Sequence, residues 1–149
     1  MKLLLDNSNL FAGGGLQVAF SFLNDLKKMP VKHHYHVVQS VKCAATFDCT
    51  AFPENFTFYT LTAVEEHSKR KRINKVRSLE NKIQPDCIFT LFGPSYHKSN
   101  FPKIVGFAIP YIIYPESPFF KKLSLKDKVY YKLLTVLKTY CFKNPPRQI

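Results

Sequence analysis

The sequence predicts an α/β domain with a doubly wound, mostly parallel sheet of about five to six strands flanked by helices. An apolar run at residues 2–6 (KLLLD) precedes three glycines, Gly13, Gly14 and Gly15, and then a helical pattern; strand, glycine turn and helix open folds of this class. Residues 86–92 (DCIFTLF) are continuously apolar, as expected of a central parallel strand buried on both faces. Other runs of strand length alternate with helical segments along the chain.

The first half of the chain supplies a helix and two further strands. Residues 16–29 repeat apolar side chains at helical spacing, and Pro30 ends the segment. Residues 34–39 (HYHVVQ) and 56–61 (FTFYTL) are rich in β-branched and aromatic residues, which favours strands, and we expect a short helical turn within residues 41–49. No carboxylate or fourth ligand lies near the clustered histidines, so we predict no metal site at His33, His34 and His36.

The second half contains a basic helix and a fifth strand. Residues 69–83 begin with Lys69-Arg-Lys-Arg72 and carry a narrow apolar stripe, and Pro85 stops the helix. Such a basic cluster can bind nucleic acid, although a solvated helix face is the commoner explanation. Residues 103–108 (KIVGFA) are expected to form the fifth strand. Because residues 97–101 are too few for a crossover helix, we expect an irregular loop or a single turn there.

The last predicted element is an amphipathic helix at residues 124–143, which opens with a cap between Ser124 and Asp127. Packing on the sheet with its lysines in water is the commoner arrangement for such a helix, and lying on a membrane surface is the alternative. Residues 144–149 (NPPRQI) follow where the alternation predicts another strand. We therefore interpret the chain as the first part of a longer protein.

Composition limits the classes of partner. The chain has 149 residues, which is the size of one domain, and a formal net charge of +12, which favours phosphorylated sugars, an acidic membrane surface or nucleic acid. The four cysteines form no CxxC pair, so we expect reduced thiols and a cytoplasmic location, with Cys87 and Cys141 buried. No stretch approaches the ~20 apolar residues of a membrane span.

The glycine turn leaves two interpretations open. Its spacing matches neither the GxGxxG fingerprint nor a P-loop, because no third spaced glycine and no Gly-Lys-Ser/Thr follow it. It is either a tight turn between strand and helix or a loop that faces a phosphate or another anion. The second interpretation rests on the unpaired N–H groups that the next helix points at the loop.

Four motifs, taken in their order along the chain, carry a family resemblance. They are Gly13-Gly-Gly15-Leu-Gln-Val-Ala19, the Gln84-Pro85-Asp86 triplet before an apolar strand, Gly106-Phe-Ala-Ile-Pro-Tyr, and Tyr114-Pro-Glu-Ser117. Together they resemble the N-terminal, Rossmann-like domain of retaining GT-B-fold glycosyltransferases (group 1 or family 4 like), the bacterial enzymes that build surface polysaccharide and lipopolysaccharide. The resemblance covers nearly the whole chain.

The resemblance implies an acceptor-binding domain whose enzyme moves a sugar from a nucleotide-sugar to a glycan or lipid-linked acceptor. It implies that Gly13, Gly14 and Gly15 face the donor diphosphate through their backbone N–H groups. The acceptor side of the cleft would be lined by Gly93, Pro94, Ser95 and Tyr96. The histidine that many relatives carry after the fifth strand is absent, since residues 108–111 read AIPY, so Tyr114 and Glu116 are the substitute candidates.

Several expectations about the whole enzyme follow from the same resemblance. The donor domain of the family has no counterpart in these residues, so we expect this chain alone to be inactive, and no catalytic base is identified in it. We expect no cofactor and no metal, with the nucleotide-sugar as a substrate. Four lysines beside aromatic residues are candidates for contact with the inner membrane face: Lys121, Lys122, Lys126 and Lys128.

The alternative function is a basic Rossmann-like module that binds nucleic acid or another polyanion and catalyses nothing. The net charge and the cluster at residues 69–72 favour it. Against it, the sequence has no zinc knuckle, no RRM signature and no helix-turn-helix spacing.

Overall fold

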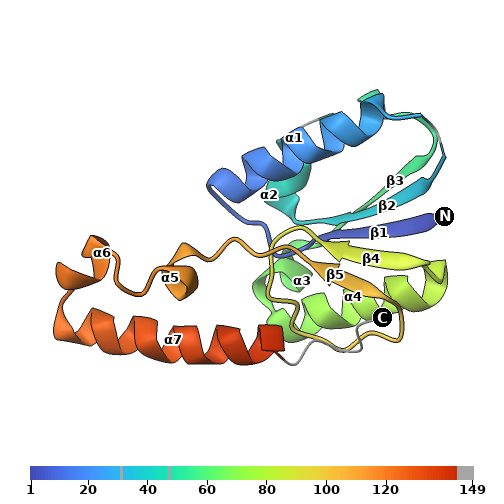
Figure 1. Cartoon of the computed structure of the whole chain (residues 1–149). Helices are drawn as coiled ribbons and strands as arrows, with labels where there is room; N and C mark the ends of the chain where they lie inside the picture. The colour runs from blue at the N-terminus through green and yellow to red at the C-terminus, as the bar shows by residue number, and fades with distance from the viewer. Residues whose placement is uncertain (31, 47, 144–149) are drawn as a thin grey trace.

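The chain is described here from a computed structural model, which covers residues 1–30, 32–46 and 48–143. Five parallel strands form one sheet (Figure 1) in the order β3-β2-β1-β4-β5. The predicted doubly wound, Rossmann-like α/β fold is therefore confirmed, with five strands. The strands are β1 (Lys2–Asn7), β2 (His34–Gln39), β3 (Phe56–Thr60), β4 (Cys87–Thr90) and β5 (Lys103–Val105).

The strand order reverses direction between β1 and β4, because the chain moves outward from β1 first through β2 and β3 and later through β4 and β5. In open α/β sheets, ligands bind outside the carboxyl ends of the strands at this switch point. Residues that follow Asn7 and Thr90 are therefore placed at the position where a ligand is expected.

Alternation along β1 sends its side chains to two separate cores. Leu4 packs with Val76 of α4 (Lys69–Ile83) on one face, whereas Leu5 packs with Leu23 of α1 (Gly14–Lys28) on the other. The two helices thus cover opposite faces of the sheet (Figure 1). By the same alternation, Asp6 lies on the α4 side.

Three short helices lie in the connections on either side of β3. They are α2 (Val41–Ala44), the 3-10 helix η1 (Cys49–Ala51) and α3 (Ala63–His67), of which the turn at residues 41–49 was predicted and α3 was not. A capping box between Thr62 and Glu65 begins α3. Its Thr-x-x-Glu pattern is visible in the sequence and could have been used to predict this helix.

Residues 110–143 form an arm that extends away from the sheet (Figure 1). It contains α5 (Pro110–Ile113), α6 (Pro118–Lys121) and α7 (Leu125–Lys143). Ser124 caps α7 as predicted: its hydroxyl donates to Asp127 at 2.6 Å and accepts from the Asp127 N–H. The expected packing of α7 on the sheet is wrong for most of its length, because Leu125, Val129 and Leu133 are exposed. Only the end of α7 approaches the sheet region, where Phe142 packs against Phe107.

Two smaller expectations are corrected. The fifth strand ends at Val105 instead of residue 108, although the Gly106 N–H still donates to the Thr90 carbonyl and the Gly106 carbonyl accepts from the Gly93 N–H. All four thiols are free, but the fully buried one is Cys43, whereas Cys87 and Cys141 are only half-buried.

No helix in the described part of the chain combines the length and apolarity that crossing a bilayer requires. Residues 144–149, which follow α7 where the alternation predicts another strand, lie outside the described residues.

Candidate functional site

A narrow polar recess lies at the switch point, between the carboxyl ends of β1 and β4. Its floor includes Asp6 and Thr90, which are direct partners in the register of the two strands. The cavity volume is ≈ 20 Å³, which is room for about one water-sized group. Its walls come from the turn after β1, from the first half of α4 and from the loop after β4: Ser8, Asn9, Arg72, Ile73, Val76, Pro94, Ser95, Tyr96 and His97.

The floor of the recess carries two buried polar side chains, of which one has no described partner and the other has one. The Thr90 hydroxyl is buried and has no hydrogen-bond partner among the described residues. Asp6 is also buried, and its Oδ1 accepts only the Ser8 N–H, at 3.1 Å. Within the described ranges, no Lys, Arg or His nitrogen lies within 4.0 Å of its carboxylate. Since buried polar groups are nearly always paired, this floor is suited to a ligand hydroxyl that donates to Asp6 and bonds Thr90.

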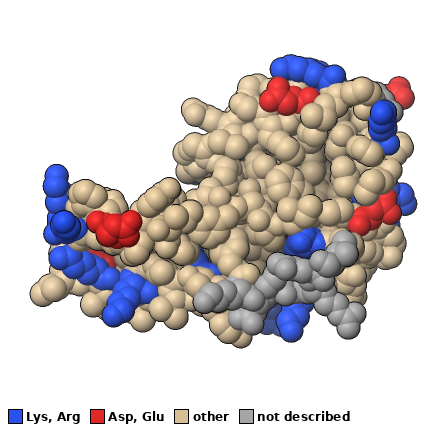
Figure 2. All heavy atoms as spheres, viewed as in Figure 1, with Lys and Arg blue, Asp and Glu red and all other residues tan. Residues whose placement is uncertain are grey.

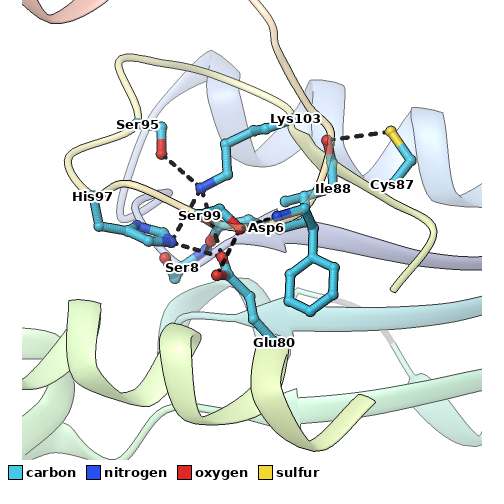
Figure 3. Close-up of polar contacts among 10 residues, drawn as sticks. Asp6, Ser8, Glu80, Cys87, Ile88, Ser95, His97, Ser99 and Lys103 are labelled. Carbon is cyan, nitrogen blue, oxygen red and sulfur yellow. Dashed lines mark hydrogen bonds and ion pairs between the residues drawn. The ribbon is translucent and has the colours of Figure 1, made fainter. Parts of the chain in front are cut away.

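A buried charged cluster holds the wall of the recess in place (Figure 3). The Glu80 carboxylate lies 2.7 Å from His97 Nε2, accepts a 2.9 Å hydrogen bond from the Ser99 hydroxyl and lies 3.6 Å from Lys103 Nζ. Lys103 in turn donates to the Ser95 hydroxyl at 3.2 Å. The cluster therefore ties the loop after β4 to α4 on one side and to β5 on the other.

Electrostatics keeps Glu80 ionised in this cluster. Burial by itself would raise the pKa of its carboxyl, but the hydrogen bond from His97, the charge of Lys103 and the bond from Ser99 outweigh burial and lower the pKa. Burial lowers the pKa of Lys103, and the nearby carboxylates of Glu80 and Asp6 oppose that shift. A carboxylate with three polar partners is a fixed anchor, so the loop is held before any ligand arrives.

The glycine turn lies at the start of α1, and its three residues differ in what they require. Gly13 has φ +69°, a left-handed conformation that favours glycine. Gly14 has open space where a side chain would be, and a Cβ at Gly15 would make only ordinary contact with Leu10 at 3.4 Å. The first turn of α1 carries no acidic residue. The backbone thus needs Gly13 for the turn, and the surface over Gly14 is open to a ligand.

The structure brings together three of the loop residues that were predicted to line the acceptor side. Pro94, Ser95 and Tyr96 all line the recess. Gly93, which is joined to Pro94 by a cis peptide bond, does not, and a Cβ there would collide with the side chains of Val105 and Phe142. Gly93 is therefore required by packing.

The other predicted residues lie on the arm. Tyr114 lines a separate aromatic cavity of ≈ 400 Å³ between α5, α6 and α7. In this cavity the ring centroid of Tyr131 lies 5.4 Å from that of Tyr111 and 5.7 Å from that of Phe119. Glu116 is exposed nearby. Lysine side chains gather toward the free end of the arm (Figure 2): Lys121, Lys122, Lys126 and Lys128. These candidates all belong to the arm, and none of them lines the recess with the loop after β4.

Sequence reasoning missed the residues that carry most of the polar chemistry. Asp6 was noted only as the end of an apolar run, and Lys103 only as the start of a strand. The clearest missed signal is Glu80, which interrupts the apolar stripe of α4 at helical spacing from Val76 and Ile83. A carboxylate on the buried face of a helix indicates that cationic or hydroxyl partners are buried with it.

In the described part of the chain, no three His, Cys, Asp or Glu side chains come close enough together to hold a metal ion. Comparisons with protein-family models, with curated proteins and with solved structures found no match to this chain.

Proposed function

We propose that this chain is the acceptor-binding, N-terminal domain of a retaining GT-B-fold glycosyltransferase in surface polysaccharide synthesis. The observation that carries the proposal is the recess at the switch point. Its floor holds the buried Thr90 hydroxyl, which has no described partner, beside the buried Asp6 carboxylate, whose described partner is the Ser8 N–H. A saccharide acceptor presents hydroxyl groups that can donate to Asp6 and bond Thr90. The sequence motifs and the parallel sheet support the choice of this class over other hydroxyl-bearing ligands.

On this proposal, the recess and the glycine turn have separate roles. The recess positions one acceptor hydroxyl, and the open surface over Gly14 offers backbone N–H groups to the donor diphosphate. Catalysis then depends on orientation and on stabilising the charge of the leaving diphosphate. The nucleotide-sugar is a substrate held mainly by a second domain, so this chain alone binds ligands without turnover.

Titration of the labelled chain with short oligosaccharides, followed by amide NMR, tests the proposal. We expect shift changes at Asp6, Thr90 and Tyr96, and at Gly14 when uridine diphosphate is added instead. Asp6→Asn weakens saccharide binding, because the amide cannot accept hydrogen bonds as a carboxylate does. Asp25→Asn is the matched control, because Asp25 pairs with Lys28 on the exposed side of α1. Absence of saccharide binding, or shift changes confined to the arm, would contradict the proposal.

We further propose that the arm places this enzyme on an anionic membrane surface, the inner leaflet in a cytoplasmic setting. One side of α7 exposes a continuous apolar stripe that includes Val129, Leu133, Val136 and Tyr140. Lysines are placed beside it, with Asp127 as the only acidic residue of the helix. Charge complementarity thus favours an anionic bilayer as the surface that covers this stripe.

Co-sedimentation with vesicles tests the membrane proposal. We expect binding to vesicles that contain phosphatidylserine and loss of that binding when Lys121, Lys122, Lys126 and Lys128 are changed to glutamate. The matched control changes four exposed lysines of the sheet region to glutamate: Lys42, Lys71, Lys82 and Lys98. Equal loss in both variants, or no binding by the unchanged chain, would refute the proposal.

A further inference from the structure

A basic groove runs along the exposed face of α4 beside the recess. It has a volume of ≈ 550 Å³ and is lined by Lys69, Arg70, Ile73, Asn74, Arg77 and Tyr96. Arg70, Asn74 and Arg77 recur at helical spacing and therefore form one stripe. Ile73 and Tyr96 also line the recess, so the two hollows share a wall.

The positive charge of this groove is not neutralised by neighbouring acids. Three cations line it and no carboxylate does. In the described part of the chain, no carboxylate oxygen lies within 4.0 Å of Arg70 or Arg77. The acidic residues of α3 and α4 all have partners elsewhere: Glu65 with Thr62 and Lys75, Glu66 with the Val41 N–H, and Glu80 with His97, Ser99 and Lys103.

The opposite wall of the groove is aromatic. Lys69 Nζ lies 3.8 Å from the centroid of the Tyr96 ring, which is a cation–π contact. The ring thus lies beside the Lys69 ammonium group and lines the groove together with Arg70 and Arg77. It belongs to the loop that Glu80 anchors through His97. Guanidinium groups bind phosphate through paired N–H donors, and an aromatic face offers apolar surface to a ligand ring.

We propose that this groove binds the phosphate of a phosphorylated polyhydroxy compound. Arg70 and Arg77 hold the phosphate with Asn74 between them, and a hydroxyl of the same ligand reaches Asp6 and Thr90 in the adjoining recess. The inference rests on the proposed function only in making this ligand the acceptor. It narrows the acceptor class to sugar phosphates or lipid-linked sugars with a phosphate next to the sugar.

Calorimetric titration with three soluble probes tests the groove: glucose 1-phosphate, inorganic phosphate and glucose. We expect glucose 1-phosphate to bind more tightly than inorganic phosphate, and glucose most weakly. The double variant Arg70→Gln with Arg77→Gln loses at least about tenfold in affinity for both phosphates, because each loses charge-assisted hydrogen bonds. The matched control, Lys71→Gln with Lys82→Gln, removes the same charge from exposed positions of α4 that do not line the groove and changes affinity less than about twofold.

Equal losses in the two variants would mean that net charge alone attracts phosphate, and that result overturns the proposal. Binding of a single-stranded oligonucleotide with no binding of glucose 1-phosphate also overturns it, because the groove would then serve a nucleic acid. A further experiment uses vesicles with and without phosphatidic acid. If only the vesicles bind in a way that depends on Arg70 and Arg77, the phosphate belongs to a lipid. If only glucose 1-phosphate binds in that way, the phosphate belongs to a soluble sugar.

The failure of this inference can be told from failure of the proposed function. If oligosaccharides shift Asp6 and Thr90 but phosphate binding ignores Arg70 and Arg77, the acceptor domain stands and the phosphate groove is wrong. If glucose 1-phosphate binds through both arginines but Asp6→Asn has no effect on it, the groove stands, and its link to the recess is wrong.

Discussion

The sheet region and the arm differ in how far their side chains are buried. In the sheet region, even charged groups are buried and paired, as Glu80 and Lys103 are. In the arm, no described side chain between residues 110 and 142 is buried, and large apolar side chains of α7 face outward. Burial of apolar surface is the main favourable term in folding. The difference teaches that the sheet region is stabilised by its own core, whereas the apolar side of the arm has no cover within the described residues and, on our proposal, is covered by a membrane surface.

Removing the Glu80 carboxylate should have the largest effect on the stability of the sheet region. Glu80→Ala leaves Lys103 buried without its carboxylate, so the free energy of unfolding falls by about 3–5 kcal/mol, as measured by urea denaturation. Adding Lys103→Met to that variant restores part of the loss, because the unpaired charge is removed. Glu54→Gln, an exposed carboxylate, is the control. If Glu80→Ala were no worse than the control, the cluster would not hold the sheet region together.

Gly106→Ala should have the next largest effect on the unfolding free energy. A Cβ at Gly106 would run into the carbonyl oxygen of Leu91, so β5 or the loop after β4 must shift, at a cost of about 1–3 kcal/mol in unfolding free energy. Gly14→Ala is the matched substitution, because Gly14 opens a helix and has free space. Thermal melting should separate the two variants clearly. Equal melting temperatures would show that the backbone around Gly106 yields easily.

The sequence predicted the sheet region far better than the site. The bounds of β2 and α4 agree with prediction, because strand composition and proline stops are local signals. The loop of Pro94, Ser95 and Tyr96 was placed correctly at the carboxyl edge, since the position follows from the fold class. Asp6, Glu80 and Lys103 were missed because their contacts depend on the register of three strands against α4.

The arm resisted prediction for a related reason. Helical spacing in residues 124–143 was sufficient to predict α7, but amphipathicity alone does not identify the surface that the apolar side will meet. The expected packing on the sheet assumed a partner within the chain. Local signals therefore predict elements in both regions, and only long-range contacts decide whether an apolar face is covered.

Acid should lower the stability of the sheet region by protonating Glu80. This loss should be smaller than the loss caused by removing the Glu80 side chain. The pKa of Glu80 is lower in the folded chain than its ordinary value of 4.5. Its contribution to stability is therefore complete above that ordinary value and is lost as the pH falls through the folded value. The difference in unfolding free energy between the unchanged chain and Glu80→Gln should shrink below about pH 4.5. A difference that does not change with pH would mean that Glu80 is not ionised.

Leu133→Ala on α7 should have the smallest effect on folding and separates the two regions most sharply. Because Leu133 is 67% exposed, its truncation removes little buried surface, and the unfolding free energy should change by less than about 0.5 kcal/mol. The same truncation at Leu4, which is 0% exposed, should cost about 2–5 kcal/mol. In the vesicle assay the order reverses: Leu133→Ala weakens binding, whereas Leu4→Ala leaves it unchanged as long as the chain stays folded. A large loss of stability from Leu133→Ala would show instead that this side of α7 is already covered in solution, for example by a second copy of the chain, and the oligomeric state measured by sedimentation would then decide between those surfaces.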